Sequence, residues 1–322
     1  MHALILQQAD QPLSYDSCDT PVPQEGQSLV RIHAAALNHR DVWITKGMYP
    51  GIVYPCILGS DGAGTTPDGR EVIINPSLNW GDNPRAQGAG YHILGLPSQG
   101  TFAEQLAIGD DKLVDKPGHL TFQQAAALPL AGLTAYRALF SRAQLQSGER
   151  VLISGVGGGV ALFACQFALA AGAEVWVTSG SEEKIAKAVD MGAKGGMNYK
   201  TAKWGKALKA QSGLFDVVID SAGGDGFGEL VRLCAPGGRI AFYGGTRGNF
   251  PALSPQLLFW KQISLLGSTM GNDQEFADMV AFVEKHKIVP VVDSVFPIAD
   301  GNAAFQRMDD GLQFGKIVLE LV

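Results

Sequence analysis

The sequence is poor in cysteine and in charged residues. Its 322 residues include only four cysteines, which are scattered and form neither a Cys-x-x-Cys pair nor a Cys/His cluster: Cys18, Cys56, Cys165 and Cys234. This spacing offers no disulfide framework and no structural zinc site. Charged residues make up 17% of the chain and the net charge is -6. An acidic balance gives no support for nucleic acid or an anionic membrane as a partner.

Targeting and membrane signals are also missing. The stretch from Met1 to Leu13 has an apolar run of only four residues and no basic start, so we expect no signal peptide and a cytoplasmic location. The longest apolar stretch, 151–177, is interrupted by a cluster of four glycines, by Gln166 and by Glu174, which argues against a membrane span. A hydrophobic content of 46% and this length predict a soluble globular protein of about two domains.

Glycine, by contrast, is abundant, and its densest cluster lies within residues 150–184. Val151-Leu152-Ile153 predicts a short buried strand, a glycine turn and a helix follow, and 174–178 predicts a second strand. Strand, glycine turn, helix and strand within about 30 residues is the dinucleotide-binding unit. The spacing G-x-x-G-x-x-A is one residue longer than the standard motif at its start, and an ordinary glycine-rich loop is the alternative. We expect the cofactor phosphates to contact the backbone at Gly155, Gly158, Gly159 and Val160.

The pattern of predicted strands and helices changes along the rest of the chain and indicates an α/β protein with two domains. Residues 1–120 show short β-prone runs, including 28–36, 71–74 and 101–108, with a hairpin signal at Pro67-Asp68-Gly69. From Thr121, a predicted N-cap, strands and helices alternate, which predicts a doubly wound parallel sheet. After Pro290 the chain again shows β-prone runs, at 291–296 and 316–322. We therefore predict a discontinuous β-rich domain (1–120 and 288–322) and a dinucleotide-binding Rossmann domain (121–287).

Several short motifs, in this order and spacing, resemble one family along nearly the whole chain. They are 36–41 (ALNHRD), 58–64 (LGSDGAG), 100–104 (GTFAE), 131–136 (AGLTAY), 220–224 (DSAGG) and 315–318 (GKIV). The chain resembles a medium-chain dehydrogenase/reductase of the zinc-free quinone oxidoreductase-like branch. The resemblance implies a GroES-like catalytic domain, a Rossmann domain, and a nicotinamide cofactor in the cleft between them.

The chain departs from the zinc-dependent alcohol dehydrogenases of that family at the metal ligands. It has Asn38 where they carry Cys, Ser60-Asp61 where they carry His-Glu, and Leu130 at the third ligand position, and the four-cysteine lobe is missing. Catalytic zinc needs three protein ligands of nitrogen, sulfur or oxygen type. We therefore expect no metal.

Without a Lewis acid, acceptors already activated by conjugation are the easier substrates. We predict an NADPH-dependent, zinc-independent oxidoreductase that transfers hydride to a quinone or an α,β-unsaturated carbonyl. One alternative is an alcohol or aldehyde dehydrogenase with an atypical site. Another is a non-catalytic protein that binds NADPH as a sensor.

Three residues are the candidates for the catalytic site. Asn38 would orient nicotinamide or substrate with its amide, although it could also serve as a local turn residue. Tyr49 would stack on the cofactor or donate a proton, and Asp41 would fix Asn38 or its loop. His39 is a weaker candidate for a general acid, and Asp61 is expected to be structural.

The second strand of the dinucleotide unit lacks the carboxylate that holds an NAD ribose. Ser179, Gly180 and Ser181 stand there instead, with Lys184 and Tyr199 following, and the resemblance matches Gly180, Lys184 and Tyr199 to NADPH contacts. Glu182 and Glu183 would repel a phosphate if they faced it, but first-turn helix positions already explain them. The rest of the cofactor groove is expected from Thr134, Ser221, Gly244, Gly267 and Ser268.

Two further expectations concern a loop and an edge. Residues 75–96 are long enough for a lid or a packed Ω-loop. The strand at 264–267 could pair with a second copy, as in the dimers of the family, so we expect a homodimer and a small-molecule substrate.

Overall fold

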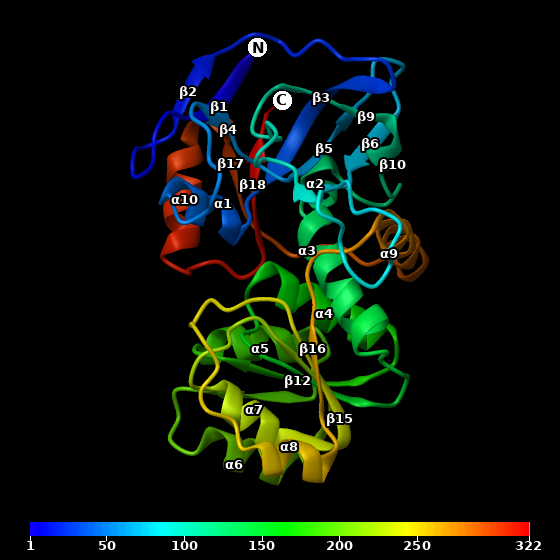
Figure 1. Ribbon diagram of the computed structural model, residues 1–322, viewed down its shortest axis with the longest axis vertical. Helices are drawn as coiled ribbons and strands as arrows, with labels where there is room; N and C mark the ends of the chain where they lie inside the picture. The colour runs from blue at the N-terminus through cyan, green and yellow to red at the C-terminus, as the bar shows by residue number, and fades with distance from the viewer. Residues whose placement is uncertain (322) are drawn as a thin grey trace. The chain divides into compact units, whose positions relative to one another are not determined.

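The computed structural model describes residues 1–321 and separates into two compact units (Figure 1). The first unit contains both ends of the chain, from Met1 to Leu133 and from Gly271 onward, and the second runs from Thr134 to Met270. Within residues 1–321 no helix is long and apolar enough to cross a membrane. The GroES-like and Rossmann folds predicted from the sequence are both present, and each unit is described by itself below.

A seven-stranded sheet is the frame of the first unit. Its longest strand, β3 (Gln27–Ala36), pairs antiparallel with three others: β5 (Asp61–Thr65), β9 (Gln105–Gly109) and β18 (Lys316–Glu320). The sheet is completed by β6 (Glu71–Ile74), β10 (Leu113–Asp115) and β17 (Val292–Pro297). A separate sheet has the order β2 (Ser14–Ser17), β1 (His2–Leu6), β4 (Cys56–Ile57). Because β18 lies beside β3, the C-terminal strand carries its side chains next to the segment that follows β3.

Two sequence predictions in this unit had different outcomes. The hairpin at Pro67-Asp68-Gly69 is confirmed, since it joins β5 to β6 with Ala63 opposite Ile73. The strand predicted at 101–108 was too long, because β9 begins only at Gln105. The amides of Thr101 and Phe102 instead donate to the carbonyls of Gly59 and Leu58, at 3.0 Å each.

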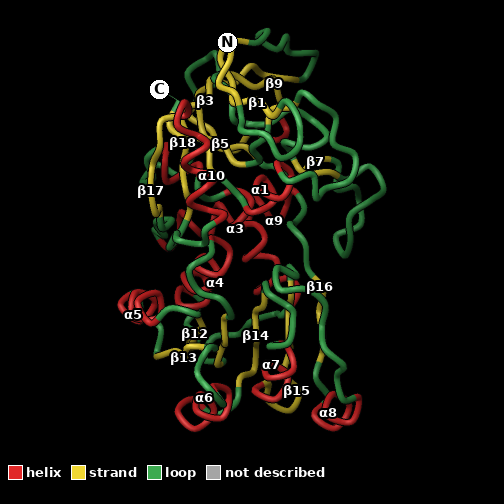
Figure 2. The backbone as a smooth tube through the Cα atoms, turned by 90° about the vertical axis from the view of Figure 1, so that its left-hand side faces the viewer, coloured by secondary structure: helices red, strands yellow, loops and turns green. Residues whose placement is uncertain are grey.

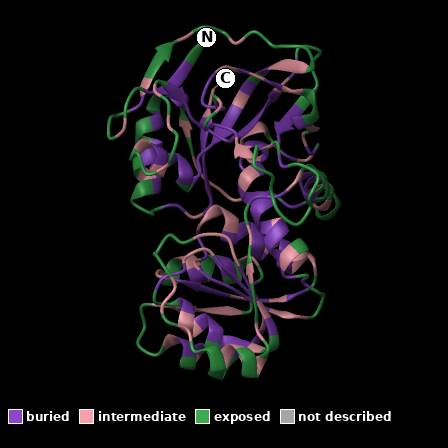
Figure 3. Cartoon of the chain, viewed as in Figure 1, coloured by how far each residue is buried: buried purple, intermediate pink, exposed green. Residues whose placement is uncertain are grey.

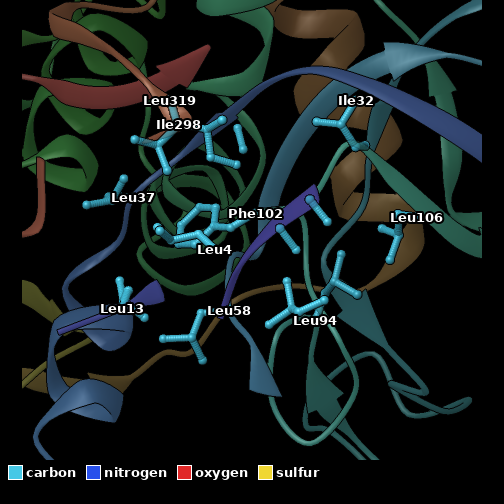
Figure 4. Close-up of a cluster of buried hydrophobic side chains, with 14 of the residues drawn as sticks. Leu4, Leu13, Ile32, Leu37, Leu58, Leu94, Phe102, Leu106, Ile298 and Leu319 are labelled. Atoms are coloured by element: carbon cyan, nitrogen blue, oxygen red, sulfur yellow. The ribbon is translucent and has the colours of Figure 1, made fainter. Parts of the chain in front are cut away.

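The core of the first unit gathers around Phe102, which is fully buried (Figure 4). Its ring meets the edge of Phe305 at 6.0 Å between centroids. Leu4 comes from β1 and Leu319 from β18, and both belong to the same cluster. Burying a side chain of this size stabilises the fold by about 1.5–3 kcal/mol. The core therefore ties the C-terminal strand to the N-terminal sheet.

The helices of the first unit range from the five residues of α2 to the 14 residues of α9. They are α1 (His39–Thr45), α2 (Phe122–Ala126), α9 (Asp273–His286) and α10 (Gly301–Asp309), with 3-10 turns at Asp110–Lys112 and Ile298–Asp300. The predicted N-cap is confirmed, because the Thr121 hydroxyl accepts from the amide of Gln124 at 3.2 Å and the Gln124 side chain accepts in return. Pro129 begins the next helix, α3 (Pro129–Tyr136), which continues as a π-helical turn at Arg137–Arg142.

The second unit is built on a six-stranded parallel sheet in the order β13, β12, β11, β14, β15, β16. The strands are β11 (Arg150–Ile153), β12 (Glu174–Ser179), β13 (Gly195–Asn198), β14 (Phe215–Asp220), β15 (Cys234–Phe242) and β16 (Ser264–Gly267). In register, Val151 lies between Val175 and Val217. Strand β11, the first strand of this unit, is thus central, and the direction in which successive strands are added reverses between β11 and β14. This is the doubly wound order that places ligands at the carboxyl ends of its strands.

Five helices accompany this sheet (Figure 2). They are α4 (Gly159–Ala170), α5 (Glu182–Asp190), α6 (Trp204–Ser212), α7 (Phe227–Leu233) and α8 (Pro255–Lys261). Helix α4 is almost entirely apolar and buries most of its length, whereas α8 has no buried residue. The contrast is visible in the burial colours of Figure 3.

Candidate active site

The glycine turn of the second unit lies between β11 and α4. Gly155 has φ of +67° and Gly157 has φ of +125°, backbone conformations that favour glycine. Helix α4 starts at Gly159, and its N-cap is Gly158. A glycine cap leaves the first-turn amides, including that of Val160, without the side-chain acceptor that serine or aspartate would supply. This arrangement is typical of the anion site in a dinucleotide-binding turn.

The segments that follow β14 and β15 lie beside this turn. A Cβ added to Gly155 would lie 3.7 Å from the hydroxyl of Ser221, and one added to Gly244 would lie 2.7 Å from the carbonyl of Ser221. The turn is fixed by Asp220, whose carboxylate accepts from the amides of Ala222 and Gly223 at 3.2 and 2.8 Å. The structure thus brings Gly155, Ser221 and Gly244 together at the carboxyl ends of β11, β14 and β15.

Three other predicted groove residues lie at the end of the edge strand β16 or on helix α3. Gly267 ends β16, and the amide of Ser268 donates to the carbonyl of Phe242 at 2.9 Å. Thr134 comes from α3, and its hydroxyl contacts the sulfur of Met270 at 3.6 Å. Gly267 and Ser268 are separated from the glycine turn by β14 and β15, so they would serve a different part of an extended ligand.

The end of β12 carries no carboxylate. Ser179 is buried, and the Ser181 hydroxyl caps α5 by accepting from the amide of Lys184 at 3.4 Å. A Cβ added to Gly180 would lie 2.8 Å from the hydroxyl of Tyr199, and one on Gly157 would lie 2.8 Å from the Lys184 stem. Glycine at both positions therefore leaves room for these two side chains.

The acidic residues after Ser181 do not close this site. Glu183 pairs with Lys187 at 2.6 Å, one helical turn further along α5. The hydrogen bond from Lys187 lowers the pKa of the Glu183 carboxyl. Glu182 and Glu183 are both exposed. Their role as first-turn residues of α5 accounts for them.

Sequence reasoning missed two cations near Tyr199. The guanidinium carbon of Arg247 lies 5.6 Å from the centre of the Tyr199 ring, and the stem of Lys200 lies 2.9 Å from a Cβ added to Gly180. The loop of Arg247 is anchored, since its amide donates to the carbonyl of Ala222 at 2.8 Å. An arginine soon after the end of β15 was the available signal, but no local pattern connects it to β13.

Asn38 organises the polar site of the first unit. It stands at the start of α1, where its backbone carbonyl accepts from the amide of Asp41 at 2.9 Å. Its side-chain nitrogen donates to Asp61 Oδ2 at 2.9 Å, and its side-chain oxygen accepts from Lys316 Nζ at 2.7 Å. Besides the local turn role considered from the sequence, the side chain therefore has partners 23 and 278 residues away.

Asp61 and Lys316 form the buried ion pair beneath Asn38. Lys316 Nζ lies 2.8 Å from Asp61 Oδ2 and also donates to the carbonyl of Leu37 at 2.7 Å. Asp61 Oδ1 accepts from the amide of Leu130 at 2.7 Å. Both charged side chains are almost completely excluded from solvent. The sequence indicated Lys316 only as part of a family motif and assigned it no role.

Asp41 holds the backbone of the same segment. Its Oδ2 accepts from the amide of Asn38 at 2.8 Å, and the residue is completely buried. Burial raises the pKa of the Asp41 carboxyl to about 6, although Arg40, the Asn38 amide and Lys316 act in the opposite direction and lower it.

Arg40 connects this site to Tyr49 and to the long loop. Its guanidinium donates to the Ser60 hydroxyl at 2.7 Å and to the Leu94 carbonyl at 2.9 Å. The ring of Tyr49 lies 5.6 Å from the guanidinium carbon. His39, in contrast, is exposed beside Trp43. Tyr49 is thus placed next to the polar cluster by Arg40, and His39 is outside it.

The loop at 75–96 is a packed Ω-loop at its base. Its ends pair as β7 (Ser77–Leu78) and β8 (His92–Ile93). Trp80 is 2% exposed and meets the Tyr91 ring at 5.2 Å. Since Leu94 is also buried and its carbonyl is bound by Arg40 and Ser60, this end of the loop is fixed in place.

No group of three or more His, Cys, Asp or Glu side chains within residues 1–321 could hold a metal ion. The cysteines are free, and three of the four are buried. Burial raises the pKa of the Cys165 thiol to about 12, so this cysteine is an inert core residue.

Comparison with known proteins gives the family. Residues 24–118 match the alcohol dehydrogenase GroES-like domain, and residues 159–285 match the domain described as zinc-binding dehydrogenase. The zinc-type alcohol dehydrogenase-like protein YogA of Leptosphaeria maculans is 33% identical, over 96% of this chain and 95% of its own length. The chain belongs to the medium-chain dehydrogenase/reductase superfamily, a class of oxidoreductases.

Solved structures agree with this assignment. A structure described as an NAD-dependent alcohol dehydrogenase has a TM-score of 0.94 and 34% identity, covering all of both chains. The quinone oxidoreductase of Thermus thermophilus, solved also as a complex with NADPH, has a TM-score of 0.84 and 27% identity over all of both chains. The superfamily is therefore established, while its members differ in cofactor and in substrate.

Proposed function

We propose that this protein is an NADPH-dependent reductase of quinones or α,β-unsaturated carbonyls that works without zinc. The observation that carries the proposal is the Asn38–Asp61–Lys316 cluster, which presents a hydrogen-bond donor and a buried ammonium where zinc-dependent relatives hold a metal. Three separate arguments support it, one for the metal, one for the cofactor and one for the acceptor.

The residues at the metal position do not fit a zinc ion. Zinc needs three protein ligands with free lone pairs. Leu130 contributes a backbone N–H, which is a donor, and Asp61 already accepts hydrogen bonds on both carboxylate oxygens. The Lys316 ammonium, 2.8 Å from Asp61, would repel a second cation there. The donor set therefore favours chemistry by hydrogen bonding alone.

The cofactor argument rests on charge. The end of β12 offers serine and glycine in place of the carboxylate that binds the 2′-hydroxyl of NAD. Lys200 lies beside Gly180, Arg247 lies over the Tyr199 ring, and Lys184 lies beside Gly157 in the glycine turn. The acidic residues of α5 are engaged or exposed. A 2′-phosphate would meet cations and a phenol hydroxyl here. This supports NADPH over NADH, as the quinone oxidoreductase solved with NADPH does.

The acceptor argument follows from what the first unit can do chemically. NADPH, when bound, supplies a hydride to the β carbon of an enone or to a quinone ring. The oxygen of the acceptor then gains negative charge and needs a donor. Asn38 offers an amide N–H held in place by Asp61 and Lys316, and a solvent proton completes the reduction to the saturated carbonyl or hydroquinone. A simple ketone would lack this built-in activation.

The test is a screen of purified protein against quinones, enones, aldehydes and simple alcohols, with NADPH and NADH in parallel and with zinc measured in the same sample. We expect NADPH oxidation with conjugated acceptors and zinc far below one ion per chain. Stoichiometric zinc with turnover of simple alcohols would instead establish an alcohol dehydrogenase, the class named in the descriptions of two relatives. Tight NADPH binding with no turnover of any acceptor would favour a sensor.

We also propose a homodimer formed through the edge of the second unit. Strand β16 ends the sheet and pairs only with β15 among the described residues. Phe259 and Trp260 on α8 are 65% and 80% exposed, and Leu265 on β16 is 36% exposed. An unpaired edge strand beside exposed aromatic residues is suited to pairing with a second copy.

The cytoplasmic location stays a prediction.

A further inference from the structure

Lys316 has every one of its donors committed. An ammonium has three N–H groups and no acceptor, and Lys316 Nζ donates to the Leu37 carbonyl at 2.7 Å, to Asn38 Oδ1 at 2.7 Å and to Asp61 Oδ2 at 2.8 Å. The residue is 3% exposed. A flexible lysine side chain is thereby held in a single position, because any rotation would break a hydrogen bond that water cannot replace.

This arrangement leaves only one orientation for the Asn38 amide. Lysine cannot accept, so the Asn38 atom that faces it must be the oxygen. An ionised aspartate cannot donate, so the atom that faces Asp61 must be the nitrogen. One of the two amide N–H groups is then used at Asp61, and the second is left as the group that Asn38 can present to a ligand.

We infer that Lys316 is a positioning residue, which fixes Asn38 as a hydrogen-bond donor and strengthens that donor by polarising its amide. The inference rests on the proposed function. A cation 2.7 Å from the amide oxygen draws electron density from the nitrogen, and hydrogen bonds in a low-dielectric site reinforce one another in this way. The positive charge of Lys316 thereby makes the free N–H of Asn38 a stronger hydrogen-bond donor to the acceptor oxygen.

A purely structural role is the competing explanation. Asp61 is buried and accepts from the Leu130 amide, so Lys316 could serve only to neutralise Asp61. Removing one member of a buried ion pair is strongly destabilising, whereas replacing both members is often tolerated. Two variants separate these explanations. Lys316→Met leaves Asp61 as an unpaired buried charge. Lys316→Met/Asp61→Asn removes that charge as well but still lacks the ammonium, so it should restore stability without restoring catalysis.

The experiment measures kcat, KM, NADPH affinity and unfolding for both variants. We expect the double variant to unfold at nearly the wild-type denaturant concentration, to bind NADPH within about threefold of wild type, and to lose about 10- to 100-fold in kcat with KM little changed. A double variant whose kcat returns to within about twofold of wild type would overturn the inference. Lys112→Met is the matched control, since Lys112 pairs with Asp273 at 2.8 Å and with Asp111, neither of which belongs to the cluster; its kcat should stay unchanged.

A second measurement does not depend on turnover. Selective 15N labelling of asparagine, with Asn38 assigned from Asn38→Ser, reports the side-chain amide directly. We expect the Asn38 amide protons of the wild type to lie downfield of ordinary side-chain amides and to move upfield in Lys316→Met/Asp61→Asn. An unchanged resonance would refute the polarisation. If the wild type reduces no quinone or enone, the proposed function fails, and this resonance still decides the role of Lys316.

Discussion

Replacing Asp41 with asparagine should make the protein increasingly stable relative to wild type as the pH rises from 5 to 8. Asp41 is fully buried, and the pKa of its carboxyl is raised from 3.8 to about 6, chiefly because burial removes water from the charged form. The asparagine introduced by Asp41→Asn has nearly the same shape and keeps an oxygen that can accept from the Asn38 amide. The substitution removes the buried negative charge and places an NH2 group at the position of Asp41 Oδ1, which has no hydrogen-bond partner, so it also adds a cost that does not depend on pH.

The sign and size follow from proton linkage. A carboxyl whose pKa is higher in the folded state stabilises the fold below its unfolded pKa, and this stabilisation is lost as the pH rises through the folded value. The difference between a pKa of 3.8 and one of about 6 corresponds to about 3 kcal/mol in total. About 1.4 kcal/mol of it remains at pH 5 and almost none at pH 8. The free energy of unfolding of Asp41→Asn relative to wild type should therefore rise by about 1.4 kcal/mol between these two pH values.

Denaturant unfolding at pH 5, 6, 7 and 8 measures this difference, because contributions of all other groups cancel between the two proteins. Glu183→Gln is the control for an absence of pH dependence. The hydrogen bond from Lys187 lowers the pKa of the Glu183 carboxyl below its usual 4.5, so the contribution of this carboxylate is already nearly complete at pH 5, and the difference between Glu183→Gln and wild type should stay nearly constant up to pH 8. A difference between Asp41→Asn and wild type that is constant with pH, or that falls toward pH 8, would refute the account of Asp41.

Three other predictions concern ligands and assembly. Lys184→Ala and Arg247→Ala should each weaken NADPH binding about 10- to 100-fold in calorimetry and leave NADH binding within about threefold, because each removes a charge-assisted contact to the 2′-phosphate; equal losses for both cofactors would contradict this. Tyr49→Phe keeps the ring beside Arg40 and should retain kcat within about threefold, whereas a loss of about 100-fold would identify the hydroxyl as a proton donor. Trp260→Glu should convert a dimer to a monomer in light scattering, and an unchanged mass would place the interface elsewhere.

The parts of the fold that sequence could predict are those with a local cause. The predicted runs 28–36 and 71–74 form β3 and β6, and the run 174–178 forms β12. The hairpin at Pro67-Asp68-Gly69 depends on turn chemistry within a few residues. In contrast, β9 starts late because Thr101 and Phe102 bond to a segment more than 40 residues earlier in the chain.

The candidate site was predicted only where a motif marked it. Asn38 and Asp41 stand in a short family motif, but the partner that orients Asn38 is Lys316, 278 residues away. Periodicity cannot reveal this contact, because it depends on β18 pairing with β3. Arg247 was missed for a similar reason, since its proximity to Tyr199 depends on the conformations of the loops that follow β13 and β15.

In the proposed function, the buried ion pair lets this site keep a positive charge without a divalent cation. Asp61 would be an uncompensated buried carboxylate without either a metal or Lys316, and such a charge costs several kcal/mol. An ammonium neutralises Asp61 but cannot bind a substrate oxygen, since all three of its N–H groups are occupied. Its charge can act on a ligand only through the amide of Asn38. A donor of this kind stabilises an enolate less strongly than a metal would, and the acceptors that suit it are those whose conjugation already spreads the charge.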